Sequence, residues 1–335
     1  MMNKNFVDFM QKYTGQKMAV AVSGGVDSVA LLYWLVKIRA DIVCLHVNHG
    51  LRIAADTEAK YVQDLCEQLN VPCHIFKWTD EKPKTGIEDA ARMARYKMMT
   101  DFCHKNGIEI ILTAHQADDQ IETFLMNLGR GSGVYGLAAM RGETLVDGIK
   151  IVRPLLGVFR RELQEYCDKN SIKYFSDEMN FDPHYTRVKI RQNRHLMESE
   201  LGISDSRILL AIQNLGRVRD AVEDFVGTAI ANVMYDGYAK FSESFLFDLA
   251  PDIRLKFLGG VIQRVGGDRY QPRLNSLIDA LDKLTADVKF TLGHCTLRRF
   301  NNQILIVPEG TNVSFRKRNE KTKKYHKSNK SKSKA

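Results

Sequence analysis

Short apolar runs typical of buried strands alternate with amphipathic runs typical of helices through residues 18–131, and this alternation limits the possible folds most strongly. The strand patterns occupy residues 18–23, 41–49, 71–78 and 108–115, and the helical patterns occupy residues 26–38, 54–70, 86–107 and 117–131. Strands separated by helices of this length form βαβ units, in which neighbouring strands run parallel. The pattern predicts an α/β fold with a parallel sheet and helices on both faces.

Three polar turns follow strands of this predicted sheet, at residues 23–28, 46–52 and 113–120. Right-handed crossover connections bring the carboxyl ends of parallel strands to one edge, where open α/β sheets bind their ligands. We therefore expect the three turns to form a single site.

The pattern changes after about residue 150. Residues 151–172 contain one strand-like piece and one helix, residues 177–196 are polar and basic, and helical periodicity returns from about residue 204. Two alternating runs flank Asn301 and Asn302, which predicts a β-hairpin. We expect a smaller, mostly helical C-terminal region with a terminal β-hairpin, and a division of the chain into residues 1–205, 206–315 and 316–335.

The positive charge of the chain is concentrated at its end. The 335 residues carry a net charge of +9, from 49 Lys and Arg and 40 Asp and Glu. Residues 316–334 contain ten Lys or Arg and one acid, so 39 basic and 39 acidic residues remain elsewhere. This composition predicts a disordered basic tail. Such a tail either only improves solubility or attracts a polyanion such as RNA, and its composition does not decide between the two.

The six cysteines form no CxxC pair, and several lie in apolar runs, which favours reduced thiols packed as small hydrophobic side chains. Residues 1–13 lack the apolar core of a signal peptide, and no apolar run approaches the ~20 residues of a membrane span. These features predict a cytoplasmic protein without a membrane partner.

The turn after the first strand has the sequence Ser-Gly-Gly-Val-Asp-Ser, residues 23–28. Glycines between a strand and a helix let backbone N–H groups and the helix N-terminus approach a phosphate. The turn lacks the GK[ST] ending of a Walker A loop and the GxGxxG pattern of dinucleotide-binding folds. Asp27 offers the hard oxygen ligand that Mg²⁺ prefers beside phosphates, so we expect Asp27 to bind that metal.

Further stretches share one family's motifs, in order: LHVNHGLR (45–52), EDAARMARY (88–96), TAHQADDQIETFLMNLGRGSGVYGLAAM (113–140), RPLL (153–156) and DEMNFDPHYTRVKIR (177–191). With the SGGVDS turn, they resemble the tRNA(Ile)-lysidine synthetase family, which uses a Rossmann-like PP-loop ATPase domain (N-type ATP pyrophosphatase). The resemblance implies a catalytic ATP-binding domain over residues 1–205 and a tRNA-binding domain over residues 206–315. It leaves the oligomeric state open, a homodimer included.

The resemblance also implies the reaction. Members ligate free L-lysine to C2 of the wobble cytidine of the isoleucine tRNA with a CAU anticodon, using ATP and Mg²⁺. The tRNA is first adenylated, and the products are lysidine, AMP and pyrophosphate. The implied partners are therefore this tRNA and free lysine.

The residues suit these roles. The loop residues Ser23, Gly24, Gly25, Val26, Asp27 and Ser28 are expected to bind ATP. Asp27, Arg95 and Asp118 are the expected catalytic residues. We expect Asp118 and Glu122 to hold the lysine amine, and Arg95 to hold its carboxylate. The expected tRNA contacts are Arg187, Lys189, Arg191 and Arg194, with Tyr185 able to stack on a base.

Three positions depart from the family's usual motifs, namely Gln116, Val188 and Ala139. A PP-loop tRNA thiolase is the closest alternative, but that chemistry commonly needs paired or cluster-binding cysteines. A nucleotide-binding module without catalysis would not need Asp27, Arg95 and Asp118 together. A metal site built from His46, His49 and His115 is the least favoured interpretation.

Overall fold

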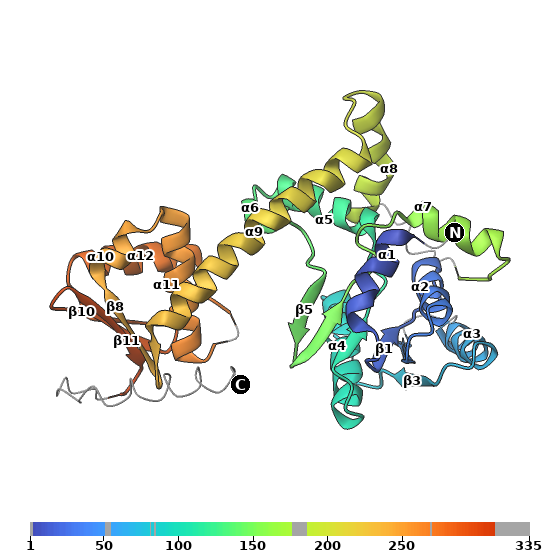
Figure 1. The fold of residues 1–335 in the computed structure, drawn as a ribbon, viewed down its shortest axis with the longest axis horizontal. Coiled ribbons are helices and arrows are strands. Elements are labelled where there is room, and N and C mark those ends of the chain that lie inside the picture. The colour runs from blue at the N-terminus through green and yellow to red at the C-terminus, as the bar shows by residue number, and fades with distance from the viewer. Residues whose placement is uncertain are drawn as a thin grey trace, which may run out of the picture. The chain divides into compact units, whose positions relative to one another are not determined.

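The computed structural model describes residues 3–50, 55–80, 82–83, 85–175, 186–268 and 270–311. The chain divides into two compact units, Met1–Arg219 and Asp220–Ala335. Each unit has its own sheet and helices (Figure 1). The division falls inside helix α9 (Asp205–Val233), whereas the sequence placed a boundary at the start of this helix. The helix is continuous across the division, so no break in its periodicity marks the place.

A six-stranded sheet forms the centre of the first unit, in the order β3-β2-β1-β4-β6-β5. Its strands are β1 (Met18–Ala21), β2 (Ile42–Asn48), β3 (Cys73–Lys77), β4 (Ile110–Leu112), β5 (Glu143–Val146) and β6 (Ile149–Val152). All neighbours pair in parallel except β5, which pairs antiparallel with β6. This arrangement confirms the predicted α/β fold with a mostly parallel sheet.

Strand β5 was not predicted, because only one strand-like piece was identified in that region. It joins β6 through Asp147 and Gly148, whose φ angles are 49° and 79°. Two positive φ angles between antiparallel strands are typical of a two-residue hairpin turn with an Asp-Gly sequence. The Asp-Gly pair was therefore a hairpin signal that the sequence analysis missed.

Helices cover both faces of this sheet. The helices of the first unit before α9 are α1 (Lys4–Met10), α2 (Val26–Lys37), α3 (Ala55–Gln68), α4 (Ile87–Lys105), α5 (Ala117–Gly129), α6 (Val134–Leu137), α7 (Arg160–Lys169) and α8 (Thr186–Ser199), with a 3₁₀ turn at Gln11–Tyr13. Apolar side chains of α1, α2, α3 and α7 pack with Val20, Cys44 and Leu112. On the other face, Met99 and Cys103 of α4 pack with Val43 and Ile111.

The described end of the polar, basic stretch belongs to helix α8, which was not predicted as a helix. Only Val188 of this helix is buried, and Met197 packs against a small cluster around Ile121, Ile208 and Ile212. The helix therefore depends on contacts with α5 and the start of α9 rather than on an apolar face of its own.

The second unit contains a five-stranded antiparallel sheet in the order β7-β8-β11-β10-β9. Its elements are β7 (Met234–Tyr235), β8 (Tyr238–Ser242), α10 (Glu243–Asp248), α11 (Pro251–Gly266), α12 (Leu274–Thr285), β9 (Phe290–Leu292), β10 (Cys295–Phe300) and β11 (Gln303–Pro308). The predicted hairpin joins β10 to β11 at Asn301 and Asn302, with φ angles of 48° and 56°. The helical region with a terminal hairpin is confirmed, and three further strands extend the hairpin into a sheet.

No helix among the described residues combines the length and the apolar character that crossing a bilayer requires. The basic tail of residues 316–335 and Tyr185 lie outside the described residues.

Candidate active site at the carboxyl edge of the parallel sheet

The glycine-rich turn joins β1 to α2 and is held in shape by its two serines. The backbone N–H of Ser23 donates to Oγ of Ser28 at 3.1 Å, and the two hydroxyl oxygens lie 3.1 Å apart. The Ser28 hydroxyl also donates to the carbonyl of Gly25 at 3.0 Å. These bonds fix the turn at the N-terminus of α2, where backbone N–H groups can receive an anion.

Gly24 is the position in this turn that requires glycine. Its φ of +93° lies in the left-handed region, and a Cβ there would lie 3.5 Å from Val62 Cγ2 and 3.7 Å from Phe175 Cδ2. Any side chain at this position would be strained by the backbone and would narrow the turn. The positive φ, rather than steric crowding, is therefore the reason for glycine at this position.

Asp27 lies in the first turn of α2, with its carboxylate partly buried. Its Oδ2 lies 3.4 Å from Nη1 of Arg160, and its buried Oδ1 has no hydrogen-bond partner among the described residues. Burial raises the pKa of Asp27 to about 6, while the charge of Arg160 opposes that rise. A partly buried carboxylate in a phosphate loop, with one oxygen unpaired among the described residues, suits a divalent cation, which would supply the missing partner.

Helix α5 begins at the same edge of the sheet with a reciprocal cap. The backbone N–H of Gln116 donates to Asp119 at 3.0 Å, and the Gln116 side chain accepts from the N–H of Asp118. The amide oxygen of Gln116 performs this capping. Asp119 is thereby committed to the helix terminus, and burial raises its pKa.

Asp118 connects helices α5, α7 and α8. Its Oδ2 accepts the backbone N–H of Arg160, at the start of α7, at 2.9 Å. Its Oδ1 forms an ion pair with Arg194 of α8, which also lies 3.0 Å from Asp205. The N-termini of α5 and α7 therefore meet at one carboxylate.

Glu122 lies one turn further along α5 and is completely buried. Its Oε1 accepts from Nε of Arg191 at 2.9 Å and lies 2.8 Å from Nη2 of the same guanidinium. Its Oε2 is buried and has no partner among the described residues. Burial raises the pKa of Glu122, and Arg191 opposes the rise.

Arg95 lies on α4 and contacts the turn after β2. Its Nε donates to Nε2 of His49 at 3.2 Å, and the His49 ring meets the Trp78 ring edge-on with centroids 6.0 Å apart. Burial and the charge of Arg95 lower the pKa of His49 to about 4. His49 is therefore a neutral acceptor that positions Arg95.

The other two histidines, His46 and His115, each have a hydrogen-bond partner of their own. His46 Nδ1 lies 2.8 Å from the carbonyl of Val22, directly before the glycine-rich turn, and His115 Nδ1 lies 3.0 Å from the Thr113 hydroxyl. Burial and nearby arginines lower the pKa of His115 to about 3. In the part of the chain that the structure describes, these histidines form no group of three metal ligands.

The four expected tRNA contacts lie on α8, but they differ in their surroundings. Arg187 and Lys189 are exposed, whereas Arg191 and Arg194 reach the two acids of α5. Sequence reasoning treated the arginines and the acids as separate sites, because 69 residues separate Glu122 from Arg191 and 76 separate Asp118 from Arg194.

Three residues around the site were not singled out as site residues by the sequence analysis. Arg160 contacts both Asp27 and Asp118, and the buried Arg153 donates to the carbonyl of Arg141 at 3.0 Å. Arg153 is the first residue of the RPLL motif and Arg160 follows the motif, so this motif was the sequence signal from which both arginines could have been identified. A third, Gln120, exchanges two hydrogen bonds with the backbone of Met140, at 3.0 Å and 2.7 Å.

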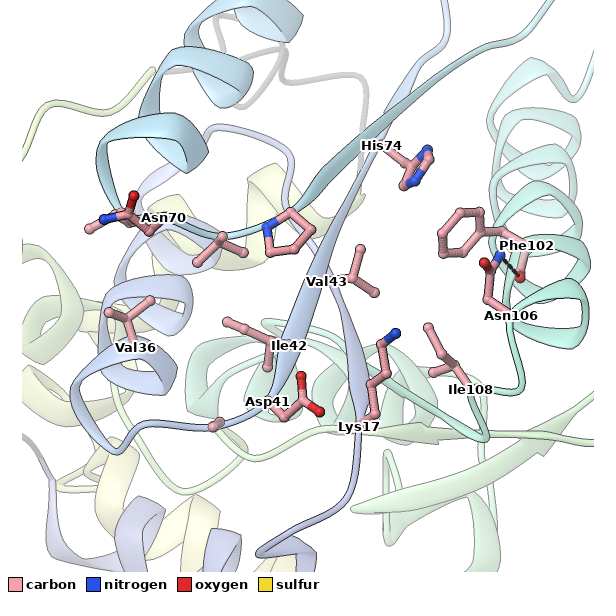
Figure 2. Close-up of a pocket in the computed structure, with 14 residues that line it drawn as sticks. Lys17, Val36, Asp41, Ile42, Val43, Asn70, His74, Phe102, Asn106 and Ile108 are labelled. Carbon is pink, nitrogen blue, oxygen red and sulfur yellow. Dashed lines mark hydrogen bonds between the residues drawn. The ribbon is translucent and has the colours of Figure 1, made fainter.

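A cavity of about 430 Å³ lies at the opposite edge of the sheet (Figure 2). Its lining includes Lys17, Asp41, Pro72 and Ile108, which come just before β1, β2, β3 and β4. It therefore opens at the amino ends of the strands and is separate from the phosphate loop.

Comparison with known proteins agrees with the motifs. The PP-loop domain family matches residues 1–198. The chain is 34% identical over 322 residues to the tRNA(Ile)-lysidine synthase of Wolbachia pipientis wMel, covering 92% of this chain and 74% of that protein. It is 33% identical over 312 residues to the enzyme of the same name from Rhodopseudomonas palustris, covering 86% and 89%.

Among solved structures, a U34-tRNA thiolase of Methanococcus maripaludis with its [4Fe-4S] cluster is similar, with a TM-score of 0.54 and 17% sequence identity. The similarity covers 64% of this chain and 78% of the thiolase. At this identity it supports the fold alone.

Proposed function

This chain belongs to the tRNA(Ile)-lysidine synthase family of PP-loop enzymes, and on that premise we propose that it joins free L-lysine to C2 of the wobble cytidine of the CAU-anticodon isoleucine tRNA. The observation that carries the proposal is a pair of carboxylates, Asp27 in the phosphate loop and the buried Glu122 on α5, each of which keeps one buried oxygen without a partner among the described residues.

The proposed reaction has two steps. In the first, the C2 carbonyl oxygen of the cytidine attacks the α-phosphorus of ATP, the bond between the α-phosphorus and the bridging oxygen breaks, and pyrophosphate leaves. In the second, the ε-ammonium of lysine loses a proton, the neutral amine attacks C2 and gives up a second proton to solvent, the bond from C2 to the adenylated oxygen breaks, and AMP leaves with that oxygen. Adenylation is needed because the unactivated oxygen is a poor leaving group.

The turn of residues 23–28 and the N-terminus of α2 would bind the phosphates of ATP. Asp27 fits Mg²⁺, because Mg²⁺ in nucleotide sites is usually held by one or two carboxylates together with the phosphates. The ion would neutralise charge on the phosphates. Among the described residues, Asp27, Asp118 and Asp119 do not form a compact group of metal ligands, so Asp27 with the phosphates is the favoured arrangement.

Free lysine carries two ammonium groups and one carboxylate, and only one amine reacts. Glu122 and Asp118 would bind the α-ammonium, and Arg95 would bind the α-carboxylate, so that the ε-amine faces C2. The free Oε2 of Glu122 is the strongest support for a cation site at this position, because a buried carboxylate oxygen without a partner is costly.

The arginines of α8 give this pocket a link to tRNA. Arg191 and Arg194 bind Glu122 and Asp118 in the protein alone, and both side chains can also bind phosphate. Transfer of these guanidinium groups to the tRNA backbone would release the acids for lysine. Arg187, Lys189, the second unit and the basic tail are further proposed tRNA contacts.

A single assay tests the proposed function. The full chain, ATP, Mg²⁺ and an isoleucine tRNA transcript with a CAU anticodon are incubated with radiolabelled lysine. We expect label in the tRNA and one AMP per lysine, and no label in a methionine tRNA with the same anticodon. AMP release without label in the tRNA would refute lysine ligation, while sulfur incorporation would indicate a thiolase.

A further inference from the structure

Three of the six cysteines, Cys44, Cys66 and Cys73, lie together inside the first unit. Their sulfur atoms are all within 4.8 Å of one another. They are separated in the sequence by 22 and 7 residues and form no CxxC pair, so the sequence analysis interpreted them as separate thiols. None of the proposed catalytic steps uses them.

The βαβ unit formed by β2, α3 and β3 brings the three thiols together. Cys44 and Cys73 are direct partners in the parallel pairing of β2 with β3, so their side chains leave the sheet on the same face. Cys66 lies near the end of α3, the helix that connects these two strands. The convergence is therefore a property of a rigid unit and not of a loop.

The surroundings suit a bound ion. Cys44 and Cys66 are buried, and Cys73 is partly exposed, which gives an ion and one exchangeable ligand access from solvent. Zn–S bonds of about 2.3 Å in a tetrahedral arrangement place sulfurs about 3.8 Å apart, within the observed limit. Thiolate ligands select soft or borderline metals such as Zn²⁺ and Cu⁺ rather than Mg²⁺.

We propose that Cys44, Cys66 and Cys73 form a three-thiolate site for a single Zn²⁺ ion, separate from the nucleotide site. Binding releases three protons, one from each thiol, as three S–H bonds are replaced by three Zn–S bonds. The resulting site carries one net negative charge, whereas Cu⁺ with three thiolates would carry two, and the smaller buried charge favours Zn²⁺. Water or an exogenous ligand would take the fourth position on the side of Cys73.

The site would stiffen the wall behind the phosphate loop. Val62 lies one helical turn before Cys66, and its Cγ2 is the atom nearest to the Cβ position of Gly24. An ion that ties α3 to β2 and β3 would therefore hold Val62 against the loop. We expect Zn²⁺ to raise the thermal midpoint of the protein whether or not ATP is present.

Metal binding to the reduced, metal-free full chain tests the proposal. We expect one Co²⁺ per chain with thiolate-to-cobalt charge-transfer absorption, displacement of Co²⁺ by Zn²⁺, and three protons released per ion. Removing a residue that only hydrogen-bonds to a metal ligand typically lowers metal affinity by about 10- to 100-fold. Cys66→Ser and Cys73→Ser each remove a ligand itself, so each should weaken Co²⁺ binding by at least about 100-fold.

Cys103→Ser is the matched control, because Cys103 is also a buried helical cysteine but packs on the other face of the sheet. It should retain the Co²⁺ spectrum. The folded state of each variant is checked by circular dichroism, and Cys73→Ser, at the least buried of the three positions, keeps the test valid if Cys66→Ser fails to fold.

Three results would overturn the proposal. If all six thiols react with a thiol reagent and neither Co²⁺ nor Zn²⁺ binds, the cysteines only pack as apolar side chains. Four titratable thiols in the unreduced protein would show a disulfide in place of a metal site. Tight binding of Cu⁺ without binding of Zn²⁺ or Co²⁺ would show that the three thiolates form a Cu⁺ site and not a Zn²⁺ site.

Discussion

Arg191 gives both of its close contacts to the same oxygen of Glu122, with Nε at 2.9 Å and Nη2 at 2.8 Å from Oε1, while Oε2 stays buried without a partner among the described residues. The carboxylate is thus only half satisfied. Such a group has a strong tendency to bind a further cation.

Glu122→Gln removes this charge without changing the shape of the side chain. We expect a cost of about 2 kcal/mol or more in lysine binding, which is about 30-fold in lysine KM, with little change in tRNA adenylation measured without lysine. Glu165→Gln is the control, because Glu165 is an exposed acid paired with Lys169. An unchanged lysine KM would remove Glu122 from the pocket.

Asp118→Asn keeps an oxygen that can accept the backbone N–H of Arg160 but weakens the ion pair with Arg194. We expect an increase in lysine KM of about 10- to 100-fold, again with a smaller effect on adenylation. Asp205→Asn removes the other partner of Arg194 and should leave the lysine KM near that of the wild type. Loss of adenylation with a normal lysine KM would assign Asp118 to the metal site.

Asp27→Asn tests the proposed Mg²⁺ ligand. We expect AMP formation to fall by about 100-fold or more, because an amide oxygen is a weaker ligand than a carboxylate. Since burial raises the pKa of Asp27 to about 6, the neutral amide should not lower the thermal midpoint in metal-free buffer. Asp8→Asn, at an exposed position on α1, should change neither quantity. Near-normal AMP formation by Asp27→Asn would refute metal binding at this residue.

His49 should make stability depend on pH in a defined direction. Its pKa is lowered to about 4 in the folded protein, against 6.5 for an ordinary histidine. The unfolded chain therefore takes up a proton first as the pH falls, so the free energy of unfolding should decrease by about 1–2 kcal/mol between pH 6.5 and 4. His49→Gln should flatten this slope in urea titrations. Equal slopes for wild type and His49→Gln would contradict the assignment.

Gly266 tests the packing of the second unit. A Cβ there would lie 2.1 Å from the backbone carbonyl oxygen of Gly293, which cannot move aside as a side-chain end could. We expect Gly266→Ala to lower the free energy of unfolding by about 1–3 kcal/mol. Gly227→Ala, also in a helix but with no atom within 4 Å of the Cβ, should be neutral or stabilising by up to about 1 kcal/mol. Denaturant unfolding of both variants measures the difference.

The sequence by itself determined the parallel α/β architecture and predicted the candidate site at one edge of the sheet. Both follow from local signals, because the alternation of strand and helix periods defines βαβ units and the turns after the strands must share one edge. The Ser-Gly-Gly turn is similarly local. Its φ of +93° at Gly24 and its Ser23–Ser28 bonds involve residues at most five positions apart.

The tertiary structure alone decided which charges meet. The pairs Glu122–Arg191 and Asp118–Arg194 depend on how α8 packs on α5, and the stretch that forms α8 was identified from the sequence only as polar and basic. The joining of Cys44, Cys66 and Cys73 likewise depends on the register of β2 with β3 and on the placement of α3 over them. Local periodicity fixes the face on which a side chain lies, but distances between side chains on different elements are set by packing, which no short stretch of sequence encodes.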